Sequence, residues 1–112
     1  MSNRRNVPRY DAPISWGELK VTVTCERHST LGRVWDISCK GLRLQLRGLH
    51  ELAEGTCLHT RIEDTRTGQH EDIELITCWS KQSHSCTFVG ARYPEALDFG
   101  ASLLSNYLPS SW

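Results

Sequence analysis

The chain is 112 residues long and carries 13 basic and 13 acidic side chains, which give a formal net charge of zero. This length suits one domain with a hydrophobic core large enough to be stable without disulfide bonds or bound metal. The neutral balance argues against a protein that binds nucleic-acid polymers or membranes through bulk electrostatics.

The cysteines are odd in number and include no Cys-x-x-Cys pair: Cys25, Cys39, Cys57, Cys78 and Cys86. The sequence has neither a secretory leader nor an apolar run of membrane-spanning length, so we expect a cytoplasmic protein with reduced thiols and no membrane insertion. The cysteines and histidines lack zinc-finger spacing, and we expect most cysteines in the core, so no metal site is predicted. A Cys–His nucleophile pair stays open, but without a catalytic signature we expect no enzyme.

The first segment, residues 1–13, is polar and basic and contains Pro8 and Pro13, which predicts an arm without a fixed conformation of its own. From residue 14 the apolar residues alternate with polar ones, as in half-buried strands. This alternation predicts strands at 19–25, from residue 33, and at 42–46, 56–63, 70–80 and 85–93. Turns are predicted at 26–32, 64–69 and 80–84, and a connection at 48–55 has room for a helical turn at 49–53.

After Pro94 the apolar residues recur at helical spacing, which predicts an α-helix over 94–108 that ends before Pro109. Gly100 in its interior costs about 1 kcal/mol relative to alanine. Six strands and a terminal helix predict an all-β fold in which an antiparallel barrel, residues 14–93, is covered at an opening or edge by the helix. One domain fills residues 1–112.

Two short motifs stand apart from this framework. Arg5-Asn6-Val7-Pro8-Arg9 fits Arg-x-x-x-Arg and follows Arg4, and Asp36-Ile37-Ser38-Cys39-Lys40-Gly41 fits Asp-x-Ser-x-x-Gly. Each is weak alone. Asp-x-Ser-x-x-Gly also describes an ordinary turn in which the glycine takes a positive φ. A second Arg-x-x-x-Arg, from Arg43 to Arg47, is interpreted as the solvated face of a strand.

In this order, and followed by an alternating Gly-Leu-Arg-Leu strand, the two motifs resemble the PilZ domain family. The resemblance covers nearly the whole chain and includes the late Val89-Gly90-Ala91-Arg92-Tyr93 stretch. It implies a six-stranded antiparallel barrel with a trailing helix, and it implies binding of the bacterial second messenger cyclic di-GMP, with no other cofactor. It carries ligand-binding roles onto Arg4, Arg5, Arg9, Asp36, Ser38 and Gly41, and we place Trp35, Lys40 and Arg33 in a possible surrounding layer.

The residue types suit this ligand. Guanidinium groups form paired hydrogen bonds with phosphate and with guanine O6 and N7, and they stack on bases. Asp36 can accept from guanine N–H groups, Ser38 adds a hydroxyl, and Gly41 permits a sharp turn or close approach. By the same resemblance, Arg4 implies that an intercalated pair of nucleotides is bound. Trp79 is interpreted as a largely buried barrel residue.

We expect the ligand to neutralise and order the arm and so relay a signal to an unidentified effector protein, because a lone domain needs a partner for its output. The alternative is a PilZ-like protein-interaction module that does not depend on nucleotide. A barrel that binds single-stranded nucleic acid is disfavoured by the neutral charge and by the acidic residues Glu63, Asp64, Glu71, Asp72 and Glu74.

Overall fold

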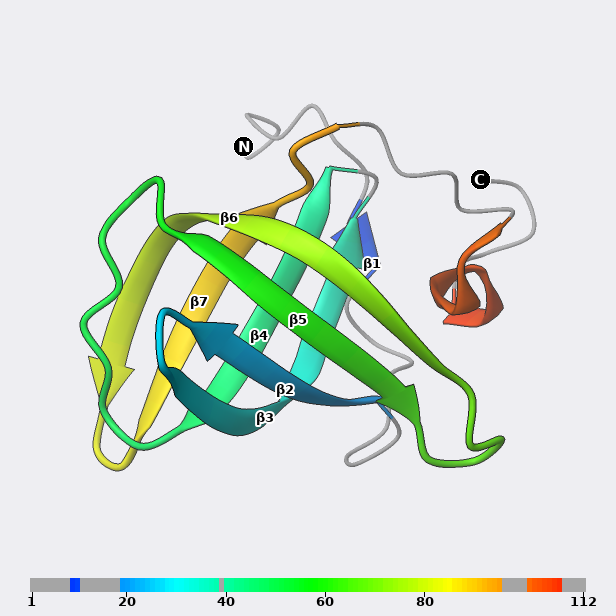
Figure 1. Cartoon of the computed structure of the whole chain (residues 1–112), viewed down its shortest axis with the longest axis horizontal. Coiled ribbons are helices and arrows are strands. Elements are labelled where there is room, and N and C mark those ends of the chain that lie inside the picture. Colours follow the sequence, from blue (N-terminus) through cyan, green and yellow to red (C-terminus); the bar gives the residue numbers. More distant parts are fainter. Residues whose placement is uncertain (1–8, 11–18, 39, 96–100, 108–112) are drawn as a thin grey trace.

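The computed structural model describes residues 9–10, 19–38, 40–95 and 101–107. Its strands are β1 (Arg9–Tyr10), β2 (Leu19–Cys25), β3 (His28–Ser38), β4 (Gly41–Arg47), β5 (Cys57–Asp64), β6 (His70–Ser83) and β7 (Cys86–Arg92). They form one antiparallel sheet in the order β1-β3-β2-β5-β6-β7-β4, and an additional β3–β4 pairing closes β2 to β7 into a barrel (Figure 1). The predicted six-stranded antiparallel barrel is confirmed.

The core lies inside this barrel and follows from the alternation of the strand sequences. In β5, residues at alternate positions are buried and exposed along its whole length. Leu44, Leu58 and Leu75, from three different strands, have no exposed surface. Burial of a side chain of this size contributes about 1.5–3 kcal/mol, so the inward-facing positions hold the barrel closed.

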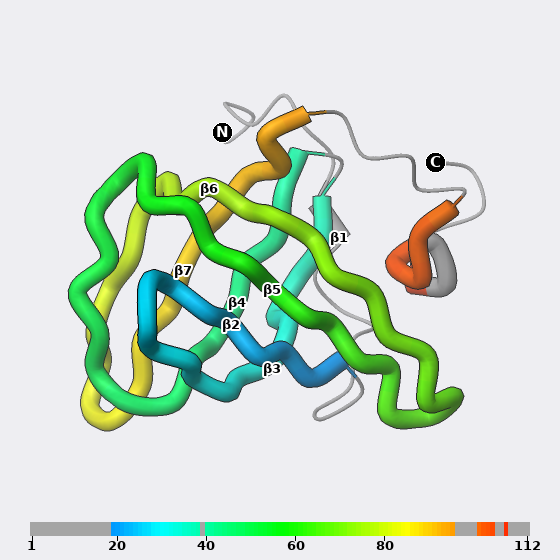
Figure 2. The backbone as a smooth tube through the Cα atoms, viewed as in Figure 1, coloured from blue at the N-terminus to red at the C-terminus, as the bar shows by residue number. Residues whose placement is uncertain are grey.

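Two hairpins extend further than the sequence predicts. The ladder between β2 and β3 runs out to Cys25 and His28, so the predicted turn at 26–32 shrinks to a tight connection in which Glu26 has a φ of 57°. The β6–β7 ladder likewise reaches Ser83, next to His84 with a φ of 55°. Most residues that β3 and β6 add to these ladders are polar, so the backbone hydrogen bonds of the hairpins hold them without a regular apolar pattern. The tube in Figure 2 shows both long hairpins.

The C-terminal segment differs from the predicted α-helix of 94–108. Its described part contains a 3-10 helix, Leu103–Tyr107, and residues 96–100 and 108 lie outside the described ranges. Ser102 Oγ accepts a bond from Leu104 N at 3.1 Å and donates to Glu71 Oε1 at 2.7 Å. This local side-chain bonding competes with an α-helical ladder. None of the helices in the described ranges is long and apolar enough to cross a membrane.

A second contact fixes the same segment to the barrel. Tyr107 Oη donates to the buried carboxylate of Asp64 at 2.9 Å, and Arg66 Nη2 donates to Tyr107 Oη at 2.9 Å. The Arg66 guanidinium also lies 5.0 Å from the centre of the Tyr107 ring. These bonds hold the 3-10 helix beside the β5–β6 turn.

The prediction that most cysteines lie in the core is wrong for the described ones. Cys57 and Cys78 are exposed, Cys25 and Cys86 are partly buried, and Cys39 lies outside the described residues. In β5 the core positions begin at Leu58, so the alternation turns Cys57 outward.

Candidate ligand-binding site

The turn between β3 and β4 is built around the hydroxyl of Ser38. Its Oγ accepts bonds from the backbone nitrogens of Lys40 and Gly41, both at 3.2 Å. The hydroxyl of Tyr93 donates to the Ser38 carbonyl at 3.3 Å from the opposite side. Ser38 is therefore buried and shapes the turn, while Lys40 next to it is exposed.

Gly41 is required for a reason that the motif does not reveal. Its φ is not positive, so the alternative interpretation of the motif as an ordinary turn with a left-handed glycine does not hold. Gly41 lies opposite Arg92 in the β4–β7 ladder, and a Cβ on it would overlap the carbonyl oxygen of Ala91. The glycine therefore allows β7 to approach the start of β4.

Asp36 is buried and paired within the protein. The β3–β4 register shifts between Val34 and Asp36, and after this bulge Asp36 lies opposite Arg43. Arg43 Nε and Nη2 lie 2.8 and 2.6 Å from Asp36 Oδ2, and the Asp36 side chain is 1% exposed.

Trp35, next to the bulge, forms a cluster with a cation and a second aromatic ring. The Arg43 guanidinium lies 4.8 Å from the centre of the Trp35 ring, and the ring of Phe88 lies 4.9 Å from it, tilted by 48°. The interpretation of Arg43 as part of a solvated face is therefore wrong, although Arg47 is exposed. Arg43 orders Trp35 and Asp36 together at the end of β3.

The structure places one predicted arm residue against this turn. β1 pairs antiparallel with the end of β3, so that Arg9 lies opposite Ser38 and Tyr10 opposite Ile37 (Figure 1). This short strand was not predicted. Arg4 and Arg5 lie outside the described residues. The two motifs, separated in sequence, thus meet through the backbone of Arg9 and Ser38.

A hollow of about 150 Å³ lies beside the turn. One of its walls is aromatic, which the sequence did not predict. Its lining includes Ser38, Lys40, Arg43, Trp79 and Arg92. Trp79 is 42% exposed, so its interpretation as a largely buried residue is wrong. Its indole lies against the backbone of Gly90, where a Cβ would overlap the ring. Cations and an exposed indole therefore surround one side of the Ser38 turn.

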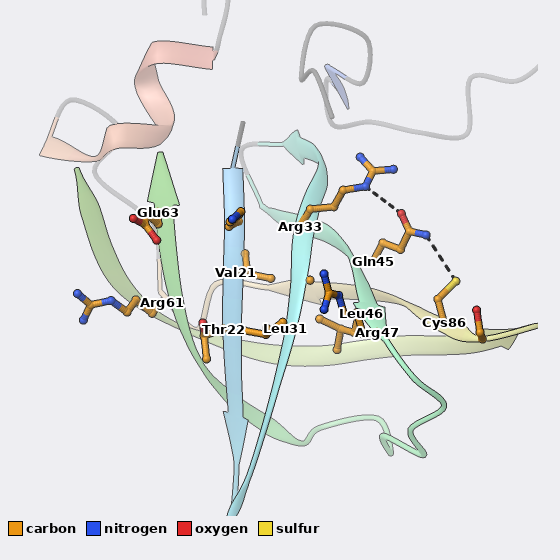
Figure 3. A pocket seen from close by; sticks show the side chains of 13 residues that line it. Val21, Thr22, Leu31, Arg33, Gln45, Leu46, Arg47, Arg61, Glu63 and Cys86 are labelled. Carbon is orange, nitrogen blue, oxygen red and sulfur yellow. Dashed lines mark hydrogen bonds between the residues drawn. The ribbon is translucent and has the colours of Figure 1, made fainter. Parts of the chain in front are cut away.

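A larger groove of about 760 Å³ crosses the outer face of β5, β2, β3 and β4 (Figure 3). Four cations from these four strands line it: Lys20, Arg33, Arg47 and Arg61. Arg33 donates to Gln45 Oε1 at 2.9 Å, which holds its side chain across β3 and β4, and burial lowers its pKa from the ordinary value. The groove is cationic, with Glu63 as its acidic member.

No protein-family model matches the chain, and no curated protein matches its sequence. Its fold is similar to the crystal structure of YcgR in complex with c-di-GMP from Escherichia coli, with a TM-score of 0.61 and 17% sequence identity. The superposition covers 93% of this chain and 42% of the YcgR chain. The likeness therefore concerns the barrel fold, and this chain spans less than half the length of that protein.

Proposed function

We propose that this chain is a PilZ-like, non-enzymatic cytoplasmic domain that binds cyclic di-GMP at the Ser38 turn. The observation that carries the proposal is the pairing of Arg9 with Ser38 beside a hollow lined by cations and Trp79. The similarity of the fold to a protein solved with c-di-GMP supports the same ligand.

The surrounding side chains match the parts of this ligand. Arg5 and Arg9 take the phosphates, aided by Lys40 at the hollow, because guanidinium and ammonium groups bond phosphate well. Trp79 offers a face on which a guanine stacks. Asp36 accepts from a guanine edge once Arg43 turns away, and Arg43 is then available to the phosphates or the base.

Arg4 determines the stoichiometry in this proposal. A further guanidinium beside Arg5 adds a plane on which a second base stacks, so that an intercalated pair is held. Titration calorimetry should give two nucleotides per chain for the natural sequence and one for Arg4→Ala. One nucleotide per chain for both proteins would contradict this part of the proposal.

The ligand also provides the signal in this scheme. Three arginines repel one another, and an anion that neutralises them favours an ordered arm against the barrel. Each charge-assisted hydrogen bond contributes about 1.5–3 kcal/mol before the cost of ordering. The rearranged arm and β1 then change the surface that an effector protein contacts.

The decisive experiment is a calorimetric titration of cyclic di-GMP into the natural protein, Arg5→Ala and Arg9→Ala. Arg27→Ala, an exposed arginine in the β2–β3 turn, is the matched control, and GTP and a short oligonucleotide are the control ligands. We expect binding that Arg5→Ala and Arg9→Ala weaken strongly and Arg27→Ala leaves unchanged. No heat with the natural protein would overturn the proposal, and equal binding by all variants would remove the arm from the site.

The second candidate is a protein-interaction module that works without nucleotide, and the cationic groove of Figure 3 favours it. Leu31 stands 50% exposed among Lys20, Arg33 and Arg47, which suits an acidic segment with an apolar anchor. Effector binding that is equal with and without cyclic di-GMP would favour this candidate.

A further inference from the structure

Three side chains with metal-binding atoms meet on the outer face of β5 and β6. Cys57 and His59 occupy alternate positions of β5 and so share its outer face. The antiparallel register places Glu74 of β6 directly opposite His59. The thiol sulfur, an imidazole nitrogen and a carboxylate oxygen all lie within 4.8 Å of one another, and His59 Nδ1 is 3.4 Å from Glu74 Oε2.

We propose that Cys57, His59 and Glu74 form a binding site for a thiophilic divalent metal ion of the Zn²⁺ class. Thiolate, imidazole and carboxylate are the donors that Zn²⁺ uses, at bond lengths of about 2.0–2.3 Å. The thiolate disfavours Mg²⁺ and Ca²⁺, which take oxygen ligands. The sequence spacing did not predict this site because its third member comes from the neighbouring strand.

The geometry needs only a small adjustment to close on an ion. Ligands of a single zinc ion lie less than about 4 Å apart when each bond is close to 2 Å. The pair His59 and Glu74 already satisfies this distance, and all three side chains are exposed and free of core packing. A rotation of the Cys57 thiol toward the pair completes three protein ligands.

The neighbourhood leaves room for the remaining coordination position. A hollow of about 490 Å³ adjoins the pair and is lined by His59, Glu74, Asp72 and Thr24 among others. A water molecule or another carboxylate can enter there, as in metal sites that keep an open position. Neither Cys57, His59 nor Glu74 lines the hollow beside the Ser38 turn, so this site does not depend on nucleotide binding.

The test uses the full chain, reduced and freed of metal, with Zn²⁺ and Co²⁺ alone as probes. Competition with a chromophoric chelator should give one Zn²⁺ per chain, and Co²⁺ should produce a thiolate-to-cobalt absorption band. Cys57→Ser should abolish the band. Loss of a residue that only hydrogen-bonds to a metal ligand lowers metal affinity by roughly 10–100-fold. His59→Ala and Glu74→Gln remove ligands themselves, so they should lower Zn²⁺ affinity by more than this.

Matched controls lie on the same barrel. Cys78→Ser removes another exposed cysteine, on β6, and His84→Ala removes an exposed histidine of the β6–β7 turn. Both should bind Zn²⁺ like the natural protein, and the far-ultraviolet circular dichroism spectrum of every variant checks that the barrel is retained. Absence of Zn²⁺ binding, a cobalt band that survives Cys57→Ser, or equal losses in Cys78→Ser would each overturn the proposal.

Discussion

The carboxylate of Asp36 lies buried against the guanidinium of Arg43, with Oδ2 only 2.6 Å from Nη2, at the bulge where β3 passes β4. Removal of the cation would leave a buried charge without this compensation. We expect Arg43→Ala to lower the free energy of unfolding by about 3 kcal/mol, at the lower end for a broken buried pair because Arg43 is partly exposed.

Urea unfolding followed by circular dichroism measures this loss. Arg47→Ala, the other arginine on the same face of β4, is the matched control and should change stability by less than about 0.5 kcal/mol. Equal small losses in the two variants would show that Asp36 does not need Arg43.

The close approach of β4 and β7 at Gly41 gives a prediction about folding. Gly41→Ala forces a methyl group onto the carbonyl oxygen of Ala91, and overpacking of this kind costs about 1–3 kcal/mol or more. Gly68→Ala tests a glycine with a positive φ of 79° and open space around it, which should cost about 1 kcal/mol. Thermal unfolding should therefore rank Gly41→Ala as the less stable, and the reverse order would contradict the packing argument.

Trp79 gives a prediction about the ligand. If a guanine stacks on its exposed indole, Trp79→Ala should weaken cyclic di-GMP binding by about 1–3 kcal/mol, and Trp79→Phe should recover part of the loss. Leu49→Ala, at another exposed apolar residue, is the control and should bind like the natural protein. Unchanged affinity in Trp79→Ala, measured by calorimetry, would place the bases elsewhere.

The contact between Tyr107 and Asp64 predicts a pH dependence. Burial alone would raise the pKa of Asp64, but hydrogen bonds from Arg66 N and Tyr107 Oη, with the charge of Arg66, hold that pKa below its usual value. A carboxyl with a lowered folded pKa stabilises the protein above its unfolded pKa, about 3.9, and loses this contribution as the pH falls through the folded pKa. Tyr107→Phe removes one bond, so the rise of stability with pH in this acid range should become shallower.

The measurement is the free energy of unfolding from urea titrations at a series of acid pH values. Tyr93→Phe is the control, because the Tyr93 hydroxyl bonds to carbonyl groups, which do not titrate. This substitution should lower the free energy of unfolding without changing its slope with pH. At the alkaline end, burial and Asp64 raise the pKa of Tyr107 to about 12. The contribution of protonated Tyr107 to the free energy of unfolding is complete below the unfolded pKa of about 10, and it is lost as the pH rises through the folded pKa. An acid slope unchanged in Tyr107→Phe would contradict the assignment.

The barrel was predictable because apolar and polar residues alternate over much of its strands, and in β5 they do so along the whole length. What alternation could not predict lies at the bulges. The β6 register shifts between Thr77 and Trp79, so Trp79 faces outward where strict alternation would turn it inward. The bulge at Trp35 similarly brings Asp36 to Arg43. Bulges depend on the partner strand, which a local pattern does not contain.

For the candidate site, the sequence showed the two motifs but not the contacts that their residues make. The Asp36–Gly41 turn and the arm at Arg9 were identified from sequence, and β1 brings the two together. Gly41 was predicted to permit a sharp turn or a close approach, but the approaching group was not predicted, because the carbonyl of Ala91 belongs to a strand far along the chain. The predicted α-helix failed in its described part because Ser102 bonds locally and to Glu71.

The indole that lies on Gly90 has a use beyond recognition. Trp79 is partly exposed to water and packs against the backbone of Gly90. The fluorescence of such a tryptophan depends on what covers its exposed face, so Trp79 is an intrinsic probe of binding next to it. Trp35, in contact with Arg43 and Phe88, is a second fluorescent tryptophan in a more enclosed setting. The difference between the emission of the natural protein and that of Trp79→Phe would isolate the signal from the Ser38 turn, without any attached dye.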